Sequence, residues 1–208
     1  MGDMYDTTTP KRLSREQSQA RTRERLLEAG QRLFIERGYG GASIRDIAEA
    51  AGYSQGAFYS NFKDKEAVLL ELLRGHMEAE AKQLTALCAA AERSGADVLA
   101  ALDAWAATLN DDANWAVLSV ELQLHARRSA TFADAYRAVW EAHRAALGRV
   151  ISRLFDLQGK VPPAAPEELA AGFMALAHGL GLQRATMAAG QSGRMIMLFL
   201  RGLLSGAG

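Results

Sequence analysis

The sequence predicts an all-α protein, and three observations carry this prediction. Of the 208 residues, 40 are Ala and 27 are Leu, whereas only 7 are Val and 5 are Ile. Ala and Leu favour helices, and β-branched residues favour strands. Residues 11–161 contain no proline, so nothing in this span forces a helix to break. Apolar residues recur at steps of three and four, and no segment alternates as a strand does.

Glycines and capping residues mark the ends of about nine predicted helices. The glycines at 38–41 end the first helix, because glycine accepts the left-handed conformation. Ser43 and Asp46 have the form of a capping box, and Ser54 and Asp64 are the expected caps of the next two helices. The helices are expected at 22–37, 44–51, 55–62, 64–93, 97–109, 114–129, 132–157, 166–187 and 193–204.

Composition excludes several classes of protein. The single cysteine, Cys88, rules out an intrachain disulfide and fits a reducing compartment. The chain opens without a signal peptide, and its longest uncharged stretch, 169–183, is too short and too mixed to span a bilayer, so we expect a cytoplasmic protein without a membrane partner. The four histidines are scattered, and no phosphate loop, nucleophile elbow or acid pair stands out. We therefore expect neither metal, cofactor nor enzymatic activity.

The formal net charge of zero is a cancellation between two parts of the chain. Residues 10–65 carry 11 basic and 7 acidic side chains, a net of +4, whereas residues 1–9 and 66–208 contribute −2 each. A basic patch of this kind is what a nucleic-acid-binding segment needs. The basic run 11–25 is either a solvated helix start or an arm that contacts phosphates.

Residues 43–62 read as helix, glycine turn, helix, which is the size of a helix-turn-helix. The outward face of the second of these helices carries no charge and offers small, hydroxyl or amide side chains. Such residues allow close approach to the major groove and hydrogen bonds to base edges. Lys63 follows at the start of the next helix, where its charge and the backbone N–H groups can both meet a phosphate.

Residues 23–69 resemble the DNA-binding domain of the TetR family of transcriptional regulators. The matching features are LL-EA---LF--RGY at 26–39, S-RDIA--AG at 43–52 and S-GAFY-NFK-KE at 54–66. Two departures are Tyr53, where the family usually has a small aliphatic residue, and Asn61, where it usually has His. The resemblance implies a basic, flexible arm at 1–20, a three-helix DNA-binding domain at 21–65 and an all-helical effector-binding and dimerisation domain at 66–208.

The resemblance also implies roles for individual residues of the DNA-binding domain. Ser43 would hold a phosphate, and Arg45 would reach the groove or a phosphate. Tyr59 and Lys63 would grip the backbone, and Asn61 would contact base or phosphate. The expected DNA-contacting residues are Thr22, Ser43, Arg45, Ser54, Gln55, Gly56, Ala57, Tyr59, Ser60, Asn61 and Lys63, of which Gln55, Gly56, Ala57 and Ser60 would face bases.

A helix-turn-helix of this size needs a second copy one helical turn of DNA away, so we expect a homodimer on a palindromic double-stranded operator. The last two predicted helices are dense in apolar and small residues and are the expected interface. The residues expected there are Leu169, Gly172, Phe173, Leu176, Leu180, Ile196, Phe199, Leu200 and Leu203.

The middle helices hold all three tryptophans, which suits a cavity for a small apolar or amphipathic effector of unknown identity. The expected lining residues are Trp105, Trp115, Leu118, Tyr136, Trp140, His143, Phe173 and Met174. The hypothesis is a repressor released by its ligand, with the helix at 64–93 as the lever. The alternatives are a DNA-binding regulator or architectural factor without a ligand, and an all-α enzyme or binding module without a DNA role.

Overall fold

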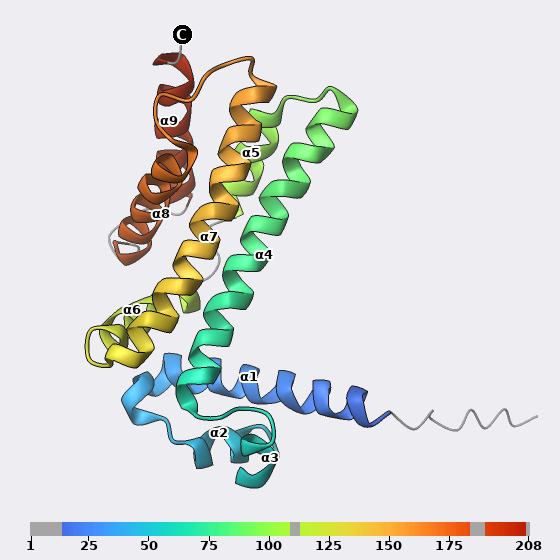
Figure 1. Cartoon of the computed structure of the whole chain (residues 1–208), viewed down its shortest axis with the longest axis vertical. Coiled ribbons are helices and arrows are strands. Elements are labelled where there is room, and N and C mark those ends of the chain that lie inside the picture. Colours follow the sequence, from blue (N-terminus) through green and yellow to red (C-terminus); the bar gives the residue numbers. More distant parts are fainter. Residues whose placement is uncertain (1–13, 109–112, 184–189, 207–208) are drawn as a thin grey trace, which may run out of the picture.

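The computed structural model describes residues 14–108, 113–183 and 190–206, which form nine helices and no strand (Figure 1). The helices are α1 (Arg15–Gly41), α2 (Ile44–Ala50), α3 (Gln55–Tyr59), α4 (Lys65–Ser94), α5 (Val98–Thr108), α6 (Ala113–Ala126), α7 (Ala130–Leu157), α8 (Pro166–Leu182) and α9 (Gln191–Gly206). The predicted all-α class is therefore confirmed.

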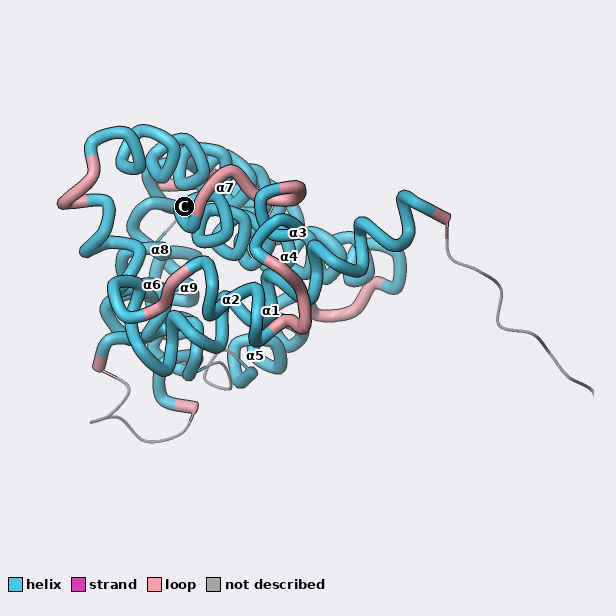
Figure 2. Tube along the Cα trace, turned by 90° about the horizontal axis from the view of Figure 1, so that it is seen from below, coloured by secondary structure: helices cyan, strands magenta, loops and turns pink. Residues whose placement is uncertain are grey.

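The molecule has a head made of the long α1 and the short α2 and α3, and a body in which α4 and α7 are the longest helices. In Figure 1, α1 runs across the base of the long, adjacent α4 and α7, and α2 and α3 lie beneath α1. The helices α8 and α9 lie on the same side of α7, with α8 packed against it, and α6 lies low in the body, close to α1. Seen from below in Figure 2, the helical head covers one end of the body. We call α1–α3 the head and α4–α9 the body.

The caps predicted at Ser43, Ser54 and Asp64 are confirmed by their hydrogen bonds. The sequence could predict them because each cap depends only on residues that are neighbours in the chain. Ser43 Oγ accepts the backbone N–H of Asp46 at 3.1 Å, and an Asp46 carboxylate oxygen accepts the backbone N–H of Ser43 at 2.9 Å. Ser54 caps α3 and Asp64 caps α4 by accepting the N–H groups of Ala57 and Ala67. Each cap satisfies an N–H that the helix itself leaves unpaired.

The first helix begins earlier than predicted. Ser14 and Gln17 form a reciprocal capping box, so α1 starts at Arg15 and residues 15–20, expected in a flexible arm, are helical. Near its end, Gly38 has a φ of 72° and a ψ of 165°, which kinks the chain where the glycines were expected to end the helix. The helix expected at 55–62 ends at Tyr59, and the residues expected beyond 183 in α8 lie outside the described range.

The head does not have a core of its own. Its buried residues, such as Phe34, Ile47 and Phe58, belong to one apolar cluster that continues through the start of α4 into Leu118 and Leu122 of α6. A second cluster fills the upper body between α4, α5, α7, α8 and α9. Because the first cluster crosses the boundary expected at residue 65, the lower body and the head are packed as one unit.

Two glycines permit close helix approaches in the upper body. A Cβ at Gly193 would lie 2.0 Å from the backbone oxygen of Ala106, so only glycine lets α9 meet α5 at this point. A Cβ at Gly148 would lie 3.2 Å from Glu167 Cγ, where the first turn of α8 meets α7. These contacts hold α5, α8 and α9 around the cavity described below.

Candidate DNA-binding surface and ligand cavity

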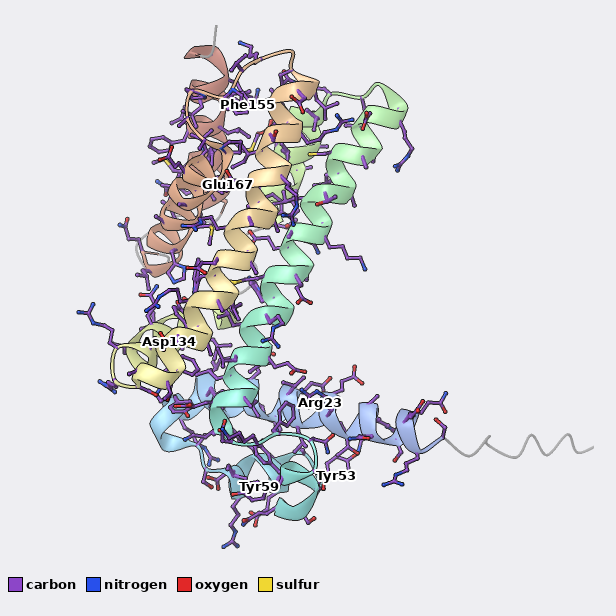
Figure 3. The ribbon with its side chains drawn as sticks, viewed as in Figure 1. Arg23, Tyr53, Tyr59, Asp134, Phe155 and Glu167 are labelled. Carbon is purple, nitrogen blue, oxygen red and sulfur yellow. The ribbon has the colours of Figure 1, made fainter. Side chains whose placement is uncertain are left out.

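The helices α2 and α3 present an exposed surface at the end of the molecule farthest from α9 (Figure 1), where α3 carries no charged residue and α2 adds the exposed Arg45 and Glu49. Tyr59 is 58% exposed and lies on this surface, as Figure 3 shows. Of the residues predicted to contact DNA, Ser43, Arg45, Ser54, Gln55, Gly56, Tyr59, Ser60 and Lys63 are exposed and Ala57 is half-buried. The backbone of α3 is open at Gly56, where an added Cβ would meet only Ser54 Oγ at 3.6 Å.

The opposite face of α3 is anchored in the head. Phe58 is fully buried, and its ring lies 5.7 Å from that of Phe62. Arg23 of α1 clamps this region: its Nε donates to Glu71 Oε1 at 2.8 Å, and its terminal nitrogens donate to Glu71 Oε2 and to the backbone oxygen of Asn61. The guanidinium also lies 4.1 Å from the centre of the Phe62 ring. One arginine thus joins α1, α4 and the end of α3, and the sequence patterns did not single it out.

Three predicted DNA contacts are engaged within the protein. Asn61 Nδ2 donates to the backbone oxygen of Ala57 at 2.8 Å, so its amide closes α3 instead of facing outward. Thr22 Oγ1 donates to the backbone oxygen of Ser18 at 2.9 Å, and its side chain is half-buried. Arg45 is exposed and paired with Glu49 at 2.8 Å, a surface ion pair that costs little to exchange for a phosphate.

The head is held to the body at the Gly38 kink. The backbone N–H of Tyr39 donates to Glu121 Oε2 of α6 at 2.8 Å. Lys65, at the start of α4, donates to the backbone oxygens of Tyr39 and Ala42 at 2.6 Å each, and its Nζ lies 4.2 Å from the centre of the Tyr39 ring. Burial lowers the pKa of Lys65. Helices α4 and α6 therefore both grip the end of α1.

A second contact at this junction comes from His125, also on α6. Its Nε2 lies 2.7 Å from Glu66 Oε1, the same oxygen to which Ser129 Oγ donates at 3.2 Å. The imidazole packs against the rings of Tyr39 and Phe132, with centroid distances of 4.1 and 4.6 Å. Burial, followed by the charges of Glu66 and Asp64, raises the pKa of Tyr39 to about 12, so its hydroxyl stays protonated at neutral pH.

The body contains a cavity of about 470 Å³, and each helix from α4 to α9 contributes residues to its wall. Six of the eight predicted lining residues line it, namely Trp105, Trp115, Trp140, His143, Phe173 and Met174. The other two do not: Leu118 is fully buried in the cluster shared with the head, and Tyr136 packs against that cluster. The period of a helix does not distinguish a position in the core from one that lines a cavity.

The polar lining of the cavity was largely missed by sequence patterns. It includes His76, Glu80 and Gln83 of α4, Ser119 of α6 and His178 of α8. His143 Nε2 lies 3.1 Å from Glu80 Oε2, and Gln83 Oε1 accepts the indole N–H of Trp105 at 3.2 Å. The rings of His76 and Trp115 stack with a centroid distance of 3.7 Å. Burial lowers the pKa of His178, which keeps its imidazole neutral at pH 7.

The predicted interface residues differ in how far they are buried within the single chain. Leu180 and Leu200 are buried within the chain, and Phe173, Ile196 and Leu200 line the cavity. Gly172 and Phe199 are exposed, and the remaining three, Leu169, Leu176 and Leu203, are half-buried. The exposed apolar surface of α9 consists of Leu198 and Phe199, which are 64% and 51% exposed. Of the nine residues predicted for the interface, Gly172 and Phe199 are thus the two that are exposed on the single chain.

None of the helices in the described ranges is both long and apolar enough to cross a membrane. Within the same ranges, no three His, Cys, Asp or Glu side chains come together as metal ligands would.

The geometry defines a class of protein: an all-helical chain with a helix-turn-helix head on a cavity-bearing body. Residues 26–72 match the family described as bacterial regulatory proteins, tetR family, and residues 94–205 match the C-terminal domain described as BetI-type transcriptional repressor. The chain therefore belongs to the TetR family of bacterial transcriptional regulators.

Individual relatives agree with this assignment. The transcriptional repressor AcnR of Corynebacterium efficiens is 29% identical over 130 residues, which are 62% of each chain. The chain thus spans less than two thirds of the length of this relative, and about a quarter of several others. Among solved structures, a regulator of Mesorhizobium loti assigned to the TetR family has a TM-score of 0.72 at 19% identity and covers 94% of this chain and 100% of its own. A transcriptional regulator of Rhodococcus sp. Rha1 has a TM-score of 0.65 at 26% identity, covering 89% and 97%.

Proposed function

We propose that the chain is a homodimeric transcriptional repressor that binds a palindromic operator through α2 and α3 and is released by a small ligand in the body cavity. The observation that carries the DNA-binding part is the exposed face of α3. This face holds Gln55, Gly56 and Ser60, and it is bordered by Tyr59 and Lys63. A helix of this composition can approach base edges closely, and the flanking hydroxyl and ammonium groups suit phosphates.

The dimer is proposed to form through α8 and α9. The surface of these helices combines the exposed Leu198 and Phe199 with a small-residue face at Gly172 and Gly179. An added Cβ at either glycine would meet nothing within 4 Å in the single chain, so the face is open to a partner helix. Apolar side chains beside a small-residue face suit close packing of helices across a two-fold axis.

Release is proposed to pass through α6 as well as α4. Helix α6 lines the cavity with Trp115 and Ser119 and holds Tyr39 of the head through the carboxylate of Glu121 and the ring of His125. A ligand that shifts α6 relative to α4 would strain both head contacts. A ligand that binds the shifted state better would move the population away from the arrangement that fits DNA. This adds α6 to the hypothesis in which α4 is the lever.

The test uses the full chain and a random duplex library that spans about two helical turns. Selection is expected to enrich a palindrome, and sedimentation of the complex is expected to give two chains per duplex. Duplexes without two-fold symmetry, or one chain per duplex at saturation, would contradict the proposed dimer. A DNA affinity that does not depend on sequence would contradict a role as a specific repressor.

A further inference from the structure

A row of aromatic side chains runs from the end of α1 to the wall of the body cavity. Its members, in order, are Tyr39, His125, Phe132, Tyr136, Trp140 and His178. The ring centroids of successive members lie 4.1, 4.6, 6.0, 5.9 and 5.4 Å apart, so each ring is paired with the next. We call these residues the aromatic row.

Helix α7 provides the middle of the aromatic row. Phe132, Tyr136 and Trp140 follow each other at intervals of four residues, which places their side chains on one face of the helix. In Figure 1, α7 begins beside α6 near the head and runs the length of the body. Phe132 is buried in the apolar cluster shared with the head, and Trp140 packs against this cluster while also lining the cavity. The row therefore connects the core of the head with the cavity by direct packing.

The head end of the row lies where α1 is held to the body. The Tyr39 ring packs against His125, while the backbone N–H of Tyr39 donates to Glu121 Oε2 at 2.8 Å. Lys65 Nζ lies 4.2 Å from the centre of the same ring. A shift of the His125 ring would therefore act on the residue through which α4 and α6 both hold α1.

The cavity end of the row has incomplete hydrogen bonding. Three buried nitrogens in this region, Trp140 Nε1, His143 Nδ1 and His178 Nε2, have no hydrogen-bond partner among the described residues. Burial raises the pKa of Tyr136, and a weaker interaction of its hydroxyl with Trp140 lowers it in part without completing a hydrogen bond to Nε1. An indole N–H is a donor, and a neutral imidazole offers an acceptor at Nε2 in one of its tautomers. Because unpaired buried groups cost free energy, the rings of Trp140 and His178 gain from any rearrangement that supplies a partner.

We propose that the aromatic row transmits the state of the cavity to the head, and that Trp140 is the positioning residue at which this transmission starts. The proposal rests on the ligand-responsive function proposed above and adds a route along α7 to the contacts of α4 and α6. A ligand that turns Trp140, or supplies a partner for its indole N–H, changes the packing of Tyr136 and Phe132. That change reaches Tyr39 through His125 and shifts the population toward a state in which α1 is held differently.

The test perturbs the cavity end of the row and observes the head, so it needs neither ligand nor DNA. His178→Leu keeps an apolar side chain but removes the last ring, and hydrogen exchange by mass spectrometry on the full chain follows each helix. Exchange is expected to accelerate at least about twofold around Tyr39 and in α2 and α3, because an aromatic pair shifts an equilibrium by at least this factor. Exchange in α5 is expected to stay unchanged.

Two control variants on α8 separate the row from general damage to the cavity. Met174→Ala truncates a cavity-lining side chain one turn earlier on the same helix, outside the row, and is expected to leave exchange in the head unchanged. His178→Phe keeps a ring at the end of the row while removing both nitrogens, and it is also expected to leave the head unchanged. The melting temperature of each variant shows whether it is folded.

Interruption of the row in its middle shows whether the effect travels along it. Tyr136→Leu removes the central ring and is expected to accelerate exchange in the head at least about twofold on its own. Adding His178→Leu to Tyr136→Leu is expected to give no further acceleration, because the two ends of the row are then no longer joined. An effect of His178 that reaches the head by another path would instead add to that of Tyr136→Leu.

The proposal is overturned if His178→Leu leaves exchange in the head unchanged, if Met174→Ala or His178→Phe accelerates it as much, or if the effects of Tyr136→Leu and His178→Leu add. Failure of the repressor function has a different signature, which is the absence of binding to selected duplexes. If the head responds as expected but the chain does not bind selected duplexes, the aromatic row stands and the function proposed above falls. If the chain binds duplexes but its head does not respond to His178→Leu, the reverse holds.

Discussion

Replacement of Glu121 by alanine tests whether α6 holds the head. The substitution removes the acceptor of the Tyr39 N–H, which Glu121 Oε2 meets at 2.8 Å beside the Gly38 kink. A backbone N–H left without a partner costs about 1–3 kcal/mol, and the partial burial of Tyr39 places the expected loss at about 1–2 kcal/mol. This corresponds to a roughly 5- to 30-fold change in the equilibrium between held and released head.

Two measurements detect this loss of stability. Urea unfolding monitored by tryptophan fluorescence gives the change in free energy of unfolding, and hydrogen exchange by mass spectrometry locates it. Exchange is expected to accelerate in α1–α3 and at the start of α4 and to stay unchanged in α8 and α9. Glu121→Gln keeps an acceptor oxygen and is expected to lose less than half as much as Glu121→Ala. Glu141→Ala, at an exposed position on α7, is the control. The reasoning is refuted if Glu121→Ala behaves like Glu141→Ala, or if protection falls equally in α9.

Three further substitutions test the head, the upper body and the proposed dimer. Arg23→Lys removes the two-pronged contact with Glu71 and is expected to lower the free energy of unfolding by about 1–2 kcal/mol and to weaken operator binding; unchanged urea unfolding would contradict the clamp. Gly193→Ala places a Cβ 2.0 Å from the backbone oxygen of Ala106 and is expected to lower the free energy of unfolding, measured by thermal unfolding, by about 1–3 kcal/mol. The control is Gly202→Ala on the same helix, where an added Cβ meets nothing within 4 Å, and it is expected to lower this free energy by less than about 0.5 kcal/mol. Phe199→Asp puts a charge on the exposed face of α9 and is expected to give monomers by light scattering, while a dimer of unchanged affinity would exclude this face as the interface.

Local features of the fold were predictable from the sequence. The caps at Ser43, Ser54 and Asp64 depend on side chains within three residues, so their patterns are readable without knowledge of the tertiary structure. The start of α1 was missed for a related reason. The reciprocal pair of Ser14 and Gln17 lies inside a run of charged residues that reads equally well as a solvated arm.

Contacts between distant residues had no such signal. Glu121 and Tyr39 are separated by 82 residues, and Arg23 and Glu71 by 48, and nothing in the spacing of these residues links them. The family resemblance implied that Asn61 contacts base or phosphate, but its amide donates to the backbone oxygen of Ala57, a contact that the resemblance did not indicate.

The lining of the cavity could be predicted from the sequence only in part. The three tryptophans were recognisable as wall residues because large aromatic side chains gather on the middle helices. Glu80 was not, because a glutamate in the middle of a long helix usually faces water. Only the packing of α4 against α7 brings it opposite His143.

The central claim is that α3 reads an operator while residues beside it hold the DNA backbone. The most direct test measures the affinity of Gln55→Ala and Lys63→Ala for selected duplexes and for single-base variants of them, over a range of salt concentrations. Lys63→Ala is expected to weaken binding to all duplexes alike and to reduce the salt slope by about 1 per head. Gln55→Ala is expected to change the preferred base and keep the slope. Arg149→Ala, exposed on α7, should change neither. If Gln55→Ala and Lys63→Ala bind every duplex as the unaltered chain does, α3 does not read DNA.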